Sequence, residues 1–139
     1  MDKLAKLPGS PLTEDMEPVK SLVRRIALPG VANPNAVAHR LLVDREPGTR
    51  MDPLTARHLA SHYGSLAFDI ARIANEDPAL AERIHPDGPE IWAQVAYARD
   101  NEWAETVDDV LRRRTTVTIR GLDDASVRAR VEEMLGHKA

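Results

Sequence analysis

The sequence predicts an all-α fold, a single domain of six to eight short helices that cross irregularly. Three observations support it. Apolar residues recur at spacings of three and four through most of the chain. The pairs Asn33-Pro34 and Asp52-Pro53 place a capping side chain directly before a proline, which is typical of helix starts. Glycines and prolines interrupt the pattern so often that a long parallel bundle is not expected.

The first six predicted helices can be placed in chain order from these signals. Each combines a start residue, an apolar face and a stop such as Pro29-Gly30 or Gly64. The segment from His85 to Pro89 predicts a loop before the longest helix. The predicted ranges are 18–28, 34–43, 53–63, 65–75, 77–84 and 89–103.

The last third of the chain carries weaker signals. Thr106 and Asp109 approximate a capping box before Val110 and Leu111. Polar and apolar residues alternate over 115–120, which predicts a short extended segment. Beyond it, Asp123 or Asp124 would cap a final helix that buries Val127, Val131, Met134 and Leu135 and stops at Gly136.

The chain divides into a lead-in and one domain. Five of the ten prolines fall within the first 34 residues, so residues 1–31 are expected to be a lead-in or linker segment. All five aromatic residues lie between positions 63 and 103. Because large rings dominate core burial, the core is expected around 54–111, inside a helical domain over 32–137.

Composition excludes several kinds of protein. The 19 basic and 22 acidic residues give a net charge of −3, and cysteine is absent, so thiol chemistry and disulfides are excluded. The seven glycines are too widely spaced for a G-x-G-x-x-G or P-loop sequence. No apolar run approaches the ~20 residues of a membrane span, and the N-terminus lacks a signal-peptide core. These features predict a cytoplasmic location and no dinucleotide site in this chain.

His58 and His62 are the candidate metal ligands. Their i, i+4 spacing can place two imidazoles on one metal ion. The glutamate of an H-E-x-x-H motif is absent, and a third ligand is required. The alternative interpretation, two histidines beside an apolar stripe, is favoured, so no metal is expected.

Arg112, Arg113 and Arg114 form the densest basic run. One hypothesis is a patch that binds anions or nucleic acid. Consecutive helical residues point in different directions, and Asp108 and Asp109 precede the run. The overall charge is also too balanced to favour electrostatic binding of nucleic acid. A structural role is therefore favoured, with no nucleic-acid partner.

Glu102 falls on the same helical seam as Ile91 and Val95. A carboxylate there would be partly desolvated and would require a cation. We expect a bidentate ion pair with Arg113 or Arg114, whose loss on Glu102→Ala would destabilise the fold. A general-acid role is not favoured, since no second group is evident.

Several segments together resemble one family. The segment LASHYGS at 59–65 is similar to an L-x-x-x-Y-G-S element, and AQVAYA at 93–98 to A-E-V-x-Y-A. Glu102 and the stretch TVDDVLRRRT at 106–115 resemble an E-x-A-x-T-x-x-D-x-L-x-R-R-T pattern. These elements resemble the C-terminal helical domain of FAD-dependent glycerol-3-phosphate dehydrogenases and α-glycerophosphate oxidases. Gln94 departs from the family, which usually has glutamate there.

The resemblance implies a helical appendage of a flavoprotein. In the parent enzyme, FAD and the residues that oxidise glycerol 3-phosphate to dihydroxyacetone phosphate belong to an N-terminal domain. No catalytic, cofactor-binding or metal residue is thereby implied in this chain. The resemblance instead implies structural roles for its motif residues, which are Tyr63, Gly64, Glu102, Asp109, Arg113, Arg114 and Thr115.

The resemblance also implies partners. These are the flavin domain of the same enzyme and a second subunit, in a parent enzyme peripheral to the inner face of the membrane. Two functions stay open: an accessory domain of the dehydrogenase, or a free-standing helical interaction or regulatory module that diverged from it. Strong amide-exchange protection of residues 1–31 would favour the free-standing module.

Overall fold

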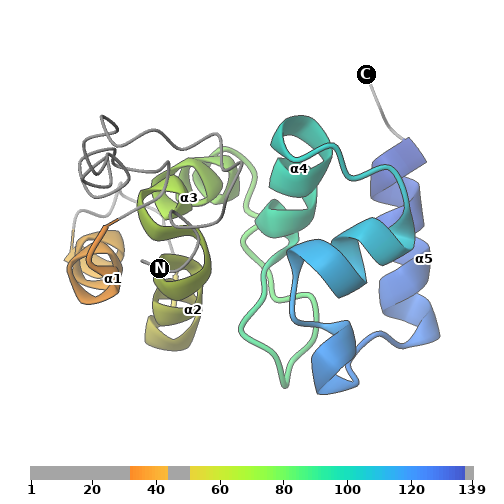
Figure 1. Ribbon diagram of the computed structural model, residues 1–139, viewed down its shortest axis with the longest axis horizontal. Helices are drawn as coiled ribbons and strands as arrows, with labels where there is room; N and C mark the ends of the chain where they lie inside the picture. Colours follow the sequence, from red (N-terminus) through yellow and green to blue (C-terminus); the bar gives the residue numbers. More distant parts are fainter. Residues whose placement is uncertain (1–31, 44–50, 137–139) are drawn as a thin grey trace, which may run out of the picture.

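The computed structural model describes residues 32–43 and 51–136, and in these ranges the chain forms five α-helices without a β-strand (Figure 1). The all-α class is confirmed, although the α-helices are fewer than the six to eight expected. The helix expected over 18–28 and the lead-in over 1–31 lie outside the described residues. The α-helices are α1 (Pro34–Val43), α2 (Pro53–Tyr63), α3 (Ala67–Glu76), α4 (Trp92–Asn101) and α5 (Ala125–Gly136).

Shorter helical segments link them. Single turns of 3₁₀-helix form at η2 (Gly64–Leu66) and η4 (Thr118–Arg120), and η3 (Asp109–Arg114) is a π-helical segment. In Figure 1, α1, α2 and α3 lie on one side of α4, while α5 lies on the other. This central position of α4 determines where the two apolar cores form.

The starts of α1 and α2 follow the sequence signals. The Asn33 side chain accepts a main-chain N–H from Asn35 at 2.9 Å. The Asp52 side chain accepts N–H groups of the first turn of α2 at 2.9 and 3.1 Å. Gly64 ends α2 with φ 55° and ψ −129°, a conformation that residues with a Cβ rarely adopt. The predicted caps and the glycine stop are therefore confirmed.

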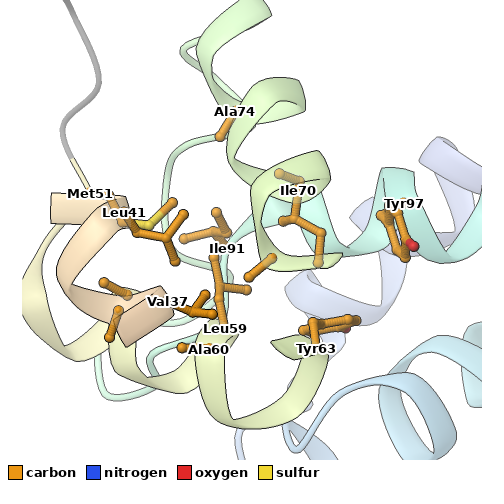
Figure 2. Packing of buried hydrophobic residues seen from close by; sticks show 14 residues of the cluster. Val37, Leu41, Met51, Leu59, Ala60, Tyr63, Ile70, Ala74, Ile91 and Tyr97 are labelled. Atoms are coloured by element: carbon orange, nitrogen blue, oxygen red, sulfur yellow. The ribbon is translucent and has the colours of Figure 1, made fainter. Parts of the chain in front are cut away.

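The first apolar core lies among α1, α2 and α3 (Figure 2). Val37, Leu59 and Ile70 represent the three helices there, and each is nearly or fully buried. Tyr97 of α4 adds its ring, which meets the Tyr63 ring edge-to-face with centroids 6.0 Å apart. One face of α4 thus closes this core.

The second core lies between α4, η3 and α5. Val95, Leu111 and Val131 are completely buried in it. Trp92 is also buried, and the Arg130 guanidinium lies 4.2 Å from its ring centroid. Every residue of 92–98 is buried, so α4 has no solvent face over this stretch and serves both cores.

Two predicted elements are wrong. Residues 77–84 form turns rather than a helix, because their main chain pairs with the segment before α4: the Ile84 N–H donates to the Glu90 carbonyl at 2.9 Å, and the Leu80 and Glu82 carbonyls accept N–H groups from the start of α4. Residues 115–120 are not extended: Val117 is 1% exposed, whereas Ile119 is 87% exposed. Strand residues two apart would share one face, so a helical turn separates these two side chains.

The longest predicted helix also begins later than expected. Residues 89–91 are not helical, and Ile91 adopts an extended conformation with φ −117° and ψ 156°. α4 then begins at Trp92 and ends at Asn101, rather than spanning 89–103.

The N-terminal caps of the last two helical segments form as predicted. Asp109 Oδ2 accepts the Thr106 N–H at 3.1 Å, and Thr106 Oγ1 accepts the Asp109 N–H at 3.1 Å. Asp124 Oδ1 accepts two N–H groups at the start of α5. Val127 and Val131 then face the second core.

Trp103 has an unusual backbone conformation after α4. The N–H groups of Glu102 and Ala104 both donate to the Ala98 carbonyl, at 3.1 Å each. Between them Trp103 has φ 58°, the left-handed conformation that glycine usually supplies at a helix end. Its side chain is 88% exposed. The fold therefore gains little buried surface from a residue whose backbone conformation is strained.

We predict that Trp103→Gly stabilises the domain by about 1 kcal/mol, since left-handed φ costs a residue with a Cβ roughly 1–2 kcal/mol and glycine's chain entropy offsets part of the gain. Denaturant unfolding measures the change. Trp103→Ala is the matched control, because it removes the ring but keeps the Cβ. Equal stabilities of the two variants would contradict the strain argument.

Candidate functional site

A buried amide links α4 to α2. Gln94 of α4 is 0% exposed, and its Oε1 accepts the Ile91 N–H at 3.0 Å. Its Nε2 donates to the Tyr63 hydroxyl at 3.3 Å and lies 3.5 Å from His58 Nε2. The amide thus fixes the start of α4 and meets two polar side chains of α2.

His58 is neutral in the folded chain. Burial is the main cause that lowers its pKa to about 4, and nearby His62 lowers it further, while the Glu90 carboxylate opposes this. Because the unfolded chain protonates His58 nearer 6.5, the folded state loses stability as pH falls from 6.5 toward about 4. The 3.9 Å contact between His58 Nε2 and Glu90 Oε1 is therefore not an ion pair at neutral pH.

Tyr63 and Arg114 join α2 to η3. The Tyr63 hydroxyl donates to the Arg114 carbonyl at 3.0 Å. Burial first, and then the charge of Glu102, raise the pKa of Tyr63 to about 12, against the hydrogen bond from Gln94. Tyr63 is thus a protonated donor at neutral pH. Thr115 follows, and its hydroxyl donates to the Val110 carbonyl at 3.0 Å, which closes the end of η3.

The prediction of an ion pair between the Glu102 carboxylate and Arg113 or Arg114 is wrong. Arg114 donates to the main-chain carbonyl of Glu102 at 3.1 Å, and not to its carboxylate. Arg113 instead pairs with Asp109 at 2.9 Å. Glu102 Oε2 is buried without a hydrogen-bond partner. Burial raises the pKa of Glu102, and the charge of Arg114 opposes this. The carboxylate lies where expected, but the guanidinium contacts the neighbouring backbone.

The three consecutive arginines do not act together. Arg112 lies 3.8 Å from Asp108, Arg113 pairs with Asp109, and Arg114 contacts the carbonyl of Glu102. Their side chains point to separate partners along η3. This distribution favours the structural interpretation over a single anion patch.

The two candidate metal ligands lie side by side. The rings of His58 and His62 have centroids 4.2 Å apart. His62 Nδ1 lies 3.0 Å from the His58 carbonyl, a bond in which the ring nitrogen must donate. Among the described residues, no group of three or more His, Cys, Asp or Glu side chains could hold a metal ion. The described part also has no helix long and apolar enough to cross a membrane.

Sequence reasoning missed Glu90 and its partners. Glu90 is 1% exposed, and its Oε1 accepts the Thr116 hydroxyl and lies 3.5 Å from Arg120 Nε. Its Oε2 has no hydrogen-bond partner, and a Cβ on Gly88 would lie 2.7 Å from it. A signal was present: Glu90 stands between a proline and the apolar pair Ile91-Trp92. Its partners come from a segment 26 residues or more away, which no local pattern indicates.

We predict that Gln94→Glu raises the pKa of His58 above its value of about 4, because a carboxylate oxygen near Nε2 would accept a hydrogen bond from the protonated ring and stabilise its charge. An NMR pH titration of the His58 ring measures the change. Gln94→Met, which has similar length but no amide, should not raise it. An unchanged His58 titration in Gln94→Glu would refute the proximity argument.

We predict that Glu102→Gln raises the melting temperature at pH 7 but not near pH 3. The folded chain holds the Glu102 proton more tightly than the unfolded chain, so ionisation above the ordinary value of 4.5 costs stability. Thermal unfolding at both pH values measures this. Glu105→Gln, an exposed neighbour, is the control; the same gain in both variants would point to net charge instead.

The sequence comparisons identify relatives. Residues 21–137 match the family model of the C-terminal domain of alpha-glycerophosphate oxidase. A segment of 72 residues is 39% identical to a glycerol-3-phosphate dehydrogenase of Synechocystis, covering 52% of this chain and 13% of that protein. A segment of 92 residues is 40% identical to a mitochondrial glycerol-3-phosphate dehydrogenase of Arabidopsis thaliana, covering 64% of this chain and 14% of that protein.

These matches are confined to a small part of the relatives. A glycerol-3-phosphate dehydrogenase of Mycobacterium bovis, 35% identical over 79 residues, is also covered over only 14% of its length. No solved structure matches the chain. The family model nevertheless includes every residue that the structure describes. This chain therefore belongs to the family of the C-terminal domain of alpha-glycerophosphate oxidase.

Proposed function

We propose that the chain is a non-catalytic accessory domain of a flavin-dependent glycerol-3-phosphate dehydrogenase. The observation that carries this proposal is the family match over residues 21–137, together with relatives named as glycerol-3-phosphate dehydrogenases. The domain would occupy 32–137 and dock on the flavin domain or on a second subunit. The parent enzyme would oxidise glycerol 3-phosphate to dihydroxyacetone phosphate.

The residues of this chain do not fit a flavin. Dinucleotide binding of the Rossmann type needs a strand, a glycine-rich turn and a helix N-terminus. The sequence has no closely spaced glycines, and the described residues contain no strand. We therefore place FAD in the parent enzyme's other domain and derive no redox step here.

The interior chemistry supports a structural role. His58 is neutral, Tyr63 keeps its proton, and Gln94 bonds to both the backbone and side chains of its own domain. Groups committed to internal hydrogen bonds at neutral pH hold the helices in place rather than transferring protons. We also propose that the parent enzyme is cytoplasmic and peripheral to the inner face of the membrane. The relatives from Arabidopsis and rat are named as mitochondrial enzymes.

A chimera tests the docking role. The C-terminal region of the Synechocystis enzyme that contains the 72 residues aligned with this chain would be replaced as a whole domain by residues 21–137 of the chain. We predict that the chimera retains flavin and reduces an artificial acceptor with glycerol 3-phosphate, whereas an enzyme lacking the segment loses flavin or unfolds at lower temperature. Flavin absorbance, thermal unfolding and dye reduction are the measurements.

Two controls sharpen the experiment. Val131→Asp places a charge in the second core and should abolish the rescue by unfolding the domain. Glu132→Gln changes an exposed residue of the same helix and should leave the rescue intact. A chimera no better than the deleted enzyme, with the chain itself folded, would refute docking and favour the free-standing module.

A further inference from the structure

Trp103 is the most exposed large apolar residue in the part of the chain that the structure describes. It is 88% exposed, and the other large apolar residues that are more than half exposed, Val43, Leu54 and Ile119, belong to other elements. A tryptophan ring offers more apolar area for burial than any other side chain, and its own domain covers little of this one. The indole is therefore available to a partner.

The backbone of Trp103 adds a second observation. In residues 32–43 and 51–136, Trp103 is the only residue other than glycine with a positive φ, which is 58°. A left-handed conformation costs stability where a Cβ is present, and strained residues of this kind are concentrated at binding sites. A contact outside the domain accounts for both the strain and the exposed ring.

The main chain on both sides of Trp103 is held in place. The N–H groups of Glu102 and Ala104 both donate to the Ala98 carbonyl, on the connection that leaves α4 in Figure 1. Ala104 is 2% exposed and belongs to the second core. Because both neighbours are anchored, little main-chain freedom remains to be lost when the ring is bound. Trp103 is thus presented on a preorganised backbone.

Arg114 places a cation beside this backbone. Its Nη2 donates at 3.1 Å to the carbonyl of Glu102, the residue directly before Trp103. Arg114 is exposed and forms no ion pair with the described residues, although its charge acts on the Glu102 carboxyl. Its remaining N–H groups can donate to a carboxylate of a partner. Tryptophan and arginine are also the side chains most enriched at the energetic centres of protein interfaces.

The surroundings of Trp103 fit a protein surface better than a lipid surface. Insertion into lipid needs an apolar face of several residues with basic residues around it. Here a single ring stands between Glu102 and the exposed Glu105, whose carboxylates anionic headgroups would repel. An apolar pocket with a carboxylate at its edge would instead accept the ring together with Arg114.

We infer that Trp103 and Arg114 form the surface through which this domain docks on the flavin domain of its parent enzyme. The inference rests on the proposed function and adds the docking surface to it. The aligned segments cover only 13% and 14% of the relatives from Synechocystis and Arabidopsis, so most of such an enzyme lies outside this domain. Because that part is tethered to the domain, its effective concentration at Trp103 exceeds that of a separate protein.

The Synechocystis chimera tests this surface. Trp103→Ala should remove most of the rise in unfolding temperature that the chimera has over the enzyme lacking the domain, and should speed flavin loss about tenfold or more. Trp103→Phe keeps an aromatic ring and should retain most of that rise. Ile119→Ala is the matched control, since Ile119 is 87% exposed on η4, and it should behave as the unsubstituted chimera does.

The isolated chain separates docking from folding. There Trp103→Gly should stabilise the domain, whereas in the chimera the same substitution should lower the unfolding temperature. A role confined to the fold would give the same sign in both settings. Arg114→Gln should also weaken docking in the chimera. Its control is Arg112→Gln, because Arg112 is exposed and lies 3.8 Å from Asp108 instead.

Four results would overturn the inference. Equal behaviour of Trp103→Ala and Ile119→Ala in a working chimera would remove the surface but leave the docking role intact. Failure of the unsubstituted chimera would refute docking itself, and the inference with it. Binding of the isolated chain to vesicles of phosphatidic acid in phosphatidylcholine, lost in Trp103→Ala, would assign the ring to lipid. A dimer of the isolated chain in sedimentation experiments, dissociated by Trp103→Ala, would assign it to a second copy.

Discussion

The fold depends on one buried amide. Gln94 lies at the start of a helix that has no solvent face over 92–98, and a polar group there must be fully hydrogen-bonded to be tolerated. Its three contacts reach the backbone of Ile91, the Tyr63 hydroxyl and the ring of His58. The same hydrogen bonds that satisfy the amide therefore set the position of α2 against α4, and the Tyr63 hydroxyl extends the link by donating to the Arg114 carbonyl of η3.

Local signals in the sequence predict much of this fold. Asn33, Asp52 and Asp124 cap helices as expected, because capping is decided within one turn. The same local reasoning fails at 77–84 and 115–120. Residues 77–84 begin with an Asp-Pro pair but form turns. Residues 115–120 alternate polar and apolar side chains, but a helical turn places Val117 in the core and leaves Ile119 exposed, an outcome that tertiary packing decides.

The candidate site was harder to predict. The partial burial of Glu102 was predicted from its place on a helical seam, but its partner was not, since a guanidinium can bond to a carbonyl as readily as to a carboxylate. The resemblance to the glycerol-3-phosphate dehydrogenase family was visible in short motifs. The contacts of Glu90 with Thr116 and Arg120 were not, because they form only when the loop before α4 packs against η4.

The absence of a solvent face on α4 has a consequence for how such a domain can be shortened or inherited. Removal of α1 to α3 would expose one apolar side of α4, and removal of α5 would expose the other. Neither half can then exclude water from its apolar core without the other. Gene fusion or recombination can therefore transfer this unit between proteins only as a whole, with crossover points outside the span from α1 to α5.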